Sequence, residues 1–324
     1  MRKLQRAISH ANIEAAYAAI DPVFLDSPLC GHAAADAAFG FRLLAKVETL
    51  NPLRSFKGRG ADWFLSSNPA SDTPLVAASA GNFGQGLAYA AGKRGRKLFI
   101  FAARTANALK LEAMRRLGAE LVIVGEDFDA AKTAARRYAA KEGFLFVEDG
   151  AEPAIAEGAG TVALEITREL ERRRARLDAI LVPLGNGALL TGIGSWMKAK
   201  MPSCRVLGIV AEQAPAMLLS WRKGDAVTTP SASTIADGIA VRVPVPYALD
   251  CMRGCVDDVL AVDEDAIRSA MRFCHEHYGL VVEPAGAAGI AAALRHGRAF
   301  SGLNVATVLC GGNPTREQLR LYFG

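Results

Sequence analysis

The chain has 324 residues, of which 51% are hydrophobic and 22% are charged, so it can bury a full core and is neither a disordered nor a fibrous protein. The net charge of +5 comes from 38 basic and 33 acidic residues. Many of the basic residues fall in stretches with helical periodicity, which indicates solvated helix faces. Aromatic residues make up only 7%, and no basic run is interleaved with stacking rings, so we expect no nucleic-acid partner.

Alternating short apolar runs and longer stretches of helical period predict an α/β protein with a mainly parallel sheet covered by helices. We predict strands at Arg42–Val47, Pro74–Ser79, Lys97–Ala102, Glu120–Val124, Phe144–Val147, Ala179–Pro183, Arg205–Ala211, Val256–Val262 and Val305–Cys310. We predict helices at Gly84–Lys93, Ala106–Leu117, Phe128–Ala140, Thr161–Arg176, Ala188–Lys200, Glu264–Tyr278 and Gly286–Leu294.

The four consecutive strand–helix units between residues 74 and 149 can form a sheet of their own. We therefore predict a small inserted α/β domain at 74–149 and a large domain made of 1–73 and 150–324. Ligands of α/β proteins bind at the carboxyl ends of strands and between domains, so the cleft between the two is the expected site.

Cysteine spacing and hydropathy indicate the cellular compartment of the protein. The six cysteines contain no CxxC pair, which favours neither a zinc site nor a disulfide framework. No secretion signal is visible, and no apolar run approaches the roughly 20 residues of a membrane span. We expect a cytoplasmic protein without a membrane partner and without a metal cluster.

Two glycine-rich turns follow predicted strands and precede predicted helices. They are Ser79–Gly86 and Pro183–Gly192. Small residues at a helix start let backbone N–H groups approach an anion, although such glycines are more often only a sign of tight packing. Neither turn fits the standard dinucleotide or Walker template, which disfavours NAD and ATP.

Lys57 lies between Phe56 and Gly58, just after a predicted strand and a turn. A single lysine is usually a solvated surface residue. A lysine desolvated in a cleft, however, loses its proton more readily and can form a Schiff base with an aldehyde.

Six motifs in order resemble the serine/threonine dehydratase and serine racemase branch of the fold-type II pyridoxal-phosphate (PLP) enzymes. They are Ser55-Phe56-Lys57-x-Arg59-Gly60-Ala61, Ser79-x-Gly81-Asn82, Gly185–Leu189, Asp237–Val241, Glu283–Ala287 and Cys310–Asn313. The resemblance implies a fold like that of the tryptophan synthase β subunit, with two open twisted sheets flanked by helices and the active site in the interdomain cleft. It also implies PLP as the cofactor, a small amino-acid substrate and a homodimer.

The resemblance implies a role for each matching residue. Lys57 would hold PLP and act as the base for the α-proton, Asn82 would bind the pyridoxal 3-oxygen, and Phe56, Gly238 and Glu283 would lie near the ring. The phosphate cradle would be Gly185, Asn186, Gly187, Ala188 and Leu189, and the substrate would meet Ser79, Ala80, Gly81, Asn82 and Phe83.

Four positions depart from the family pattern. Cys310 replaces the usual serine facing the pyridine nitrogen, and such a neutral partner moderates the electron sink. Asn186 stands where relatives often have glycine, and we expect it to tolerate a positive φ. Glu212 lacks the acidic partner of a divalent-cation site, because Leu218 occupies that position; a monovalent cation site stays open. Ala80 replaces the second serine of racemases, which predicts elimination from L-amino acids with negligible racemisation.

The implied activity is a dehydratase (ammonia-lyase) that converts a small L-β-hydroxy amino acid, threonine or serine, to a 2-oxo acid and ammonia. Arg54, where relatives usually have a small residue, could pair with a second carboxylate and would then favour 3-hydroxyaspartate. The alternatives are a β-replacement enzyme of the cysteine or diaminopropionate synthase type and a catalytically silent homologue. The intact Lys57 argues against the last.

Overall fold

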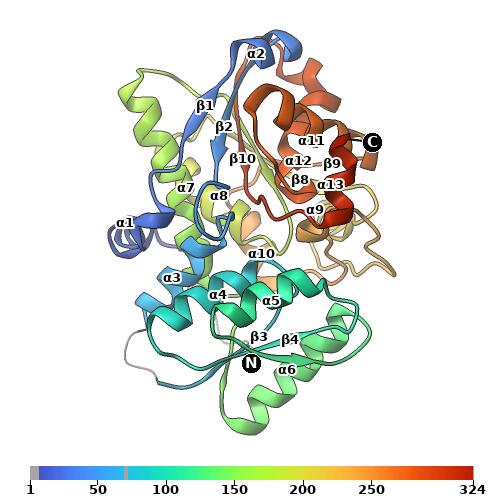
Figure 1. Ribbon diagram of the computed structural model, residues 1–324. Coiled ribbons are helices and arrows are strands. Elements are labelled where there is room, and N and C mark those ends of the chain that lie inside the picture. Colours follow the sequence, from blue (N-terminus) through green and yellow to red (C-terminus); the bar gives the residue numbers. More distant parts are fainter. Residues whose placement is uncertain (1–6, 69–71, 324) are drawn as a thin grey trace.

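The computed structural model describes residues 7–68 and 72–323. In this part of the chain, two open sheets flanked by helices lie one above the other, with the larger sheet in the upper half of Figure 1. Residues 1–6, 69–71 and 324 of the predicted large domain lie outside the described residues. No helix of the described residues is long and apolar enough to cross a membrane.

The larger sheet has six strands in the order β1-β2-β10-β7-β8-β9. The strands are β1 (Leu29–Gly31), β2 (Arg42–Val47), β7 (Ala179–Pro183), β8 (Arg205–Ala211), β9 (Asp258–Val262) and β10 (Asn304–Leu309). All neighbours run parallel except β1, which pairs antiparallel with β2 at the edge. The sequence did not predict β1, because a three-residue strand is too short to show a hydrophobic period.

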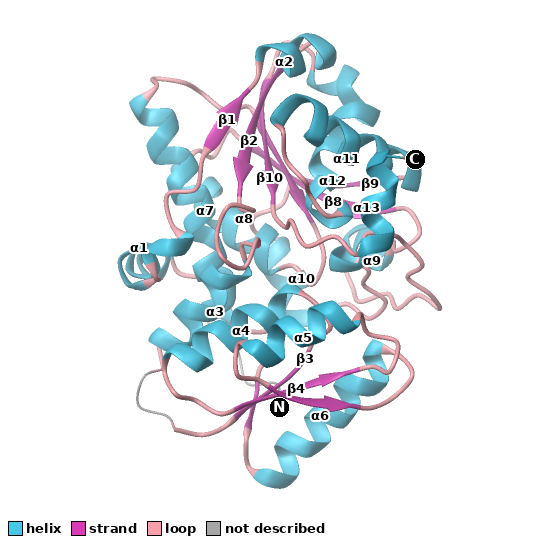
Figure 2. Ribbon diagram, viewed as in Figure 1, coloured by secondary structure: helices cyan, strands magenta, loops and turns pink. Residues whose placement is uncertain are grey.

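The smaller sheet has four parallel strands in the order β5-β4-β3-β6. Figure 2 shows two of them, β3 and β4, in its lower half. They are β3 (Leu75–Ala78), β4 (Leu98–Ala102), β5 (Glu120–Ile123) and β6 (Leu145–Phe146). All four lie between residues 74 and 149, where the sequence predicts a sheet of its own. The nine predicted strands are all present, with ends that differ by at most two residues.

Most of the helices lie between successive strands in the chain. They are α1 (His10–Ala19), α2 (Ala33–Phe39), α3 (Lys57–Ser66), α4 (Asn82–Lys93), α5 (Ala108–Arg116), α6 (Phe128–Glu142), α7 (Pro153–Arg172), α8 (Ala188–Lys200), α9 (Ala216–Lys223), α10 (Pro246–Met252), α11 (Glu264–Tyr278), α12 (Pro284–His296) and α13 (Arg316–Phe323). The seven predicted helices are confirmed, while α1, α2, α3, α9, α10 and α13 were not predicted.

Helix α7 begins eight residues before the predicted start at Thr161. Gly158 and Gly160 weaken the helical signal of its first turns. Tertiary packing overrides this propensity: a Cβ at Gly158 would lie 2.6 Å from the carbonyl oxygen of Arg59, and one at Gly160 would lie 3.0 Å from that of Gly192. The two glycines therefore allow α7 to pack closely against α3 and α8.

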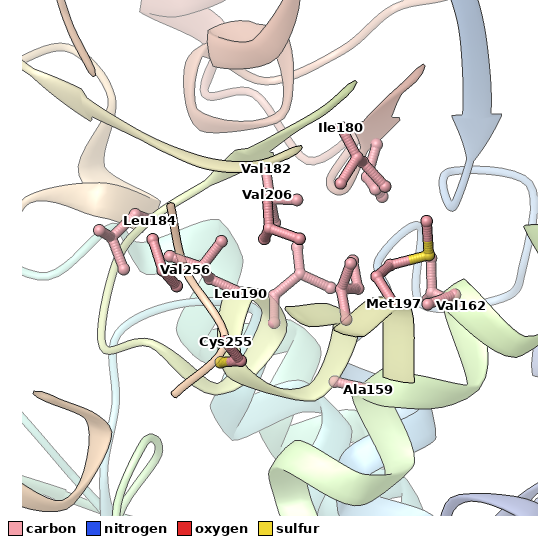
Figure 3. Close-up of a cluster of buried hydrophobic side chains, with 14 of the residues drawn as sticks. Ala159, Val162, Ile180, Val182, Leu184, Leu190, Met197, Val206, Cys255 and Val256 are labelled. Carbon is pink, nitrogen blue, oxygen red and sulfur yellow. The ribbon is translucent and has the colours of Figure 1, made fainter. Parts of the chain in front are cut away.

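A continuous apolar core joins the larger sheet to α7 and α8. Figure 3 shows part of it, in which Ile180 and Val182 of β7 and Val206 of β8 lie over Leu190 and Met197 of α8. Strands buried on both faces read as unbroken apolar runs, which explains why their positions were evident from the sequence.

A buried ionic network fixes α3 beneath this core. The guanidinium of Arg59 is fully buried and donates to Glu48 at 2.8 and 2.9 Å and to Glu165 at 2.5 and 2.9 Å. Lys46 donates to the same Glu165 at 2.6 Å. Burial alone would lower the pKa of Arg59, but the two carboxylates raise it above its ordinary value. The network thus carries two positive and two negative charges.

Candidate active site

A cavity of about 580 Å³ lies between the two sheets. The carboxyl ends of β3, β7 and β10 open into it, as expected for an α/β protein. The structure brings these predicted site residues to its wall: Phe56, Lys57, Ser79, Ala80, Gly81, Asn82, Phe83, Gly185, Asn186, Gly187, Ala188, Leu189, Gly238, Glu283 and Cys310. Arg54 is not among them.

Lys57 is the first residue of α3, and its side chain is 16% exposed in the cavity. Its Nζ lies 4.8 Å from the centre of the Phe56 ring and 5.6 Å from that of Phe83. It also donates a 2.5 Å hydrogen bond to Asp149, which follows β6. Sequence reasoning missed Asp149, because β6 is only two residues long and Asp149 comes three residues after it.

The first glycine-rich turn forms the N-terminus of α4. The Ser79 hydroxyl accepts hydrogen bonds from the N–H groups of Gly81 at 3.2 Å and Gly84 at 2.9 Å. Ser79 therefore shapes the turn, and what it can add for an anion is its own O–H. The N-cap residue, Gly81, has no side chain, and residues 79–83 line the cavity, so the positive end of the helix faces it.

The second turn forms the N-terminus of α8 and makes a tight cradle. Gly187 has φ +98°, and a Cβ there would lie 2.6 Å from Ala248. A Cβ at Gly185 would lie 2.7 Å from the carbonyl oxygen of Gly238. Asn186 does not have a positive φ, so the tolerance expected of it is not needed: the left-handed residue of this turn is Gly187.

A hydrogen-bonded network orients Asn82. Its amide nitrogen donates to Glu283 at 2.8 Å, and its oxygen accepts from the side chain of Asn313 at 2.9 Å. The backbone N–H of Asn313 also donates to Glu283. Burial raises the pKa of Glu283 above its ordinary value. The sequence indicated Asn82 and Glu283 separately but gave no role to Asn313.

The Cys310 side chain lines the cavity. It is 6% exposed, and its Sγ lies 3.9 Å from the carbonyl oxygen of Ala285. Burial raises the pKa of this thiol, and the nearby Glu283 raises it further. The group is therefore neutral near pH 7 and can offer only a weak hydrogen bond.

Ion pairs that the sequence did not reveal connect the two walls. Lys110 of α5 pairs with Asp237 at 2.6 Å, and Arg242 donates to Asp129 of α6 at 2.6 Å. A third cation, Lys132 of α6, pairs with Glu148. Each of these cations on the cavity wall therefore already has a carboxylate partner.

Two other predicted positions lie elsewhere. Arg54 is exposed with φ +50°, and its backbone oxygen accepts from Gly312, so the structure gives no support to Arg54 as a substrate ligand. Glu212 forms a 2.8 Å ion pair with Arg295, which already neutralises the carboxylate considered for a cation.

The cavity fits PLP in three respects. A lysine projects into it, and the N-terminus of α8 presents a cradle that side chains at Gly185 and Gly187 would fill. The neutral thiol of Cys310 suits an uncharged contact with a ring nitrogen.

Comparison with known proteins gives consistent matches. The family described as "Pyridoxal-phosphate dependent enzyme" matches residues 20–311. The L-threonine ammonia-lyase of Thermotoga maritima is 37% identical over 276 residues, which cover 85% of this chain and 68% of that enzyme. Several plant and bacterial threonine dehydratases are matched over 47% to 54% of their length.

Solved structures share the fold. Maize serine racemase superposes with a TM-score of 0.89 at 29% identity, covering 98% of this chain and 97% of that one. The threonine deaminase of T.th. superposes with a TM-score of 0.88 at 33% identity, covering 95% of this chain and 99% of that one. These matches confirm the predicted fold class and the predicted cofactor, PLP.

Proposed function

Because this chain belongs to the family of pyridoxal-phosphate-dependent enzymes, we propose that it is an ammonia-lyase that converts L-threonine or L-serine to a 2-oxo acid and ammonia. The observation that carries the proposal is the position of Lys57, which lies in one cavity with two helix N-termini. A ligand with two anionic ends, one phosphate and one carboxylate, suits this arrangement. The relatives named as threonine ammonia-lyases support elimination as the reaction.

The chain's own residues account for binding. Backbone N–H groups of residues 185–189 would hold the cofactor phosphate at the start of α8, where the macrodipole adds positive potential. Asn82, with its amide oriented by Glu283 and Asn313, would bind the 3-oxygen of the cofactor. PLP, when bound, supplies the electron sink that acidifies the α-proton of the substrate.

Lys57 would perform the proton transfer. A neutral lysine amine within hydrogen-bond reach of the α-carbon can remove its proton, and the surrounding rings of Phe56 and Phe83 limit access of water. The N-terminus of α4 would hold the substrate carboxylate beside Ala80 and Gly81. Loss of the β-hydroxyl then leaves an enamine that hydrolyses to the 2-oxo acid and ammonia.

The test is a release assay for 2-oxo acid and ammonia with L-serine and L-threonine. We expect turnover by the unmodified protein loaded with PLP, and we expect Lys57→Ala to lose both turnover and the visible absorbance of the lysine-bound cofactor. Lys97→Ala is the matched control, because Lys97 is exposed on the smaller sheet and pairs with Glu120. Full activity in Lys57→Ala, or no 2-oxo acid from either substrate, would contradict the proposal.

A further inference from the structure

Asp149 is a cavity residue that the proposed mechanism does not use. It is 9% exposed, and one carboxylate oxygen lies 2.5 Å from the Nζ of Lys57. The other oxygen, Oδ1, is buried and has no hydrogen-bond partner among the described residues. A buried carboxylate oxygen without a partner is unusual and calls for a functional explanation.

The backbone holds Asp149 in place. Gly150 has φ +83°, and a Cβ there would lie 2.1 Å from the carbonyl oxygen of Asn186. The segment that carries Asp149 is thus packed directly against the phosphate cradle. Glu148, the preceding carboxylate, is engaged by Lys132 and Arg136, so its charge is compensated.

The charge of Asp149 becomes uncompensated when Lys57 acts. A lysine must be neutral to accept the α-proton, so the ion pair with Asp149 is lost at that stage. Lys57 must also come within about 3 Å of that proton's carbon to remove it. Added to the 2.5 Å contact, this distance puts the Asp149 carboxylate within about 5.5 Å of the α-carbon.

The wall offers no compensation for an anionic substrate side chain. Lys110, Lys132 and Arg242 already have carboxylate partners, and Arg54 does not line the cavity. At about 5.5 Å, repulsion between two negative charges disfavours binding roughly three- to fourfold at a dielectric of ~80 and more than a hundredfold at ~20.

We propose that Asp149 is a specificity determinant that excludes amino acids with an anionic β-substituent and admits those with a neutral one. The inference rests on the proposed function, because it specifies the substrate class of the same site. It argues against 3-hydroxyaspartate, the substrate that a pocket-facing Arg54 would have favoured.

The primary experiment compares kcat/KM for L-serine, L-threonine and L-threo-3-hydroxyaspartate in the PLP-loaded protein and in Asp149→Asn. We expect the unmodified protein to prefer serine over 3-hydroxyaspartate at least tenfold, and Asp149→Asn to reduce this preference at least tenfold. Asp127→Asn is the matched control: Asp127 lines the same cavity, but its side chain is 55% exposed and lies 3.3 Å from Arg242. We expect that control to change the preference less than twofold.

A binding measurement makes the test independent of turnover. L-alanine and L-aspartate are titrated into the loaded proteins, and Kd is read from the visible spectrum of the cofactor. We expect alanine to bind at least tenfold more tightly than aspartate, with the ratio falling at least tenfold in Asp149→Asn. A ratio within twofold of the unmodified protein, or an unmodified protein that prefers aspartate, overturns the inference. Failure of the unmodified protein to turn over any substrate overturns the proposed function instead, while the titration still reports on Asp149.

Discussion

Replacing Arg59 by methionine tests whether the buried network holds the lysine-bearing helix in place. Arg59 is fully buried and bridges Glu48 and Glu165, so its removal leaves an uncompensated carboxylate in the core. Breaking one partner of a buried ion pair costs about 3–5 kcal/mol. With an unfolding entropy of about 2.1 cal/mol/K per residue, a loss of ~4 kcal/mol in this chain of 324 residues lowers Tm by about 6 °C.

The charge balance gives a sharper test. Lys46 still pairs with Glu165 in Arg59→Met, so Glu48 is the carboxylate left without a cation. Adding Glu48→Gln removes that charge, and we expect the double variant to recover about 1–3 kcal/mol relative to the single one. The comparison separates the cost of an unpaired charge from the cost of lost packing.

The stability lost in Arg59→Met should depend on pH. An uncompensated carboxylate in the core costs stability while it is charged, and protonation at low pH removes this cost. The stability gap between Arg59→Met and the unmodified protein should therefore widen from pH 5 to pH 8. Thermal unfolding followed by circular dichroism measures the fall in Tm of Arg59→Met, the recovery in the double variant and the change of the stability gap with pH. A Tm within 1 °C of the unmodified protein, or a double variant no more stable than the single one, would refute the reasoning.

Two further predictions concern the cavity and its surroundings. Burial raises the pKa of Glu152 to about 7, with Glu148 adding to the effect, so stability should fall as pH rises from about 4.5 through 7. Glu152→Gln should abolish this dependence and stabilise the protein by about 1–3 kcal/mol at pH 8, and equal denaturation midpoints at that pH would contradict it. Ala80 lines the cavity without a hydroxyl, so chiral chromatography of L-serine reactions should show negligible D-serine. Ala80→Ser is expected to reveal racemisation, and D-serine formed by the unmodified protein as fast as pyruvate would show that another residue fills that role.

The sequence by itself located nine of the ten strands and seven of the thirteen α-helices of the described residues. Strands buried on both faces appear as apolar runs with turn residues between them. It also located Lys57 and the two glycine-rich turns, since a reactive lysine and close anion approach each require particular residue types at adjacent positions. The apolar runs, the lysine motif and the glycine-rich turns each depend only on neighbouring residues in the chain. They can be recognised in the sequence without knowing which residues pack against them.

The tertiary structure decided which side chains meet. The pairs Lys57–Asp149 and Asn82–Glu283 join residues 92 and 201 positions apart, and no local pattern encodes such a contact. It also decided that Arg54 is exposed and that Gly187, not Asn186, takes the left-handed conformation. Backbone conformation in the cradle depends on the close approach of Ala248 and Gly238 from later in the chain. Charge compensation across a cleft is set by the packing of the two sheets, which is why the property that we assign to Asp149 could be inferred only from the folded protein.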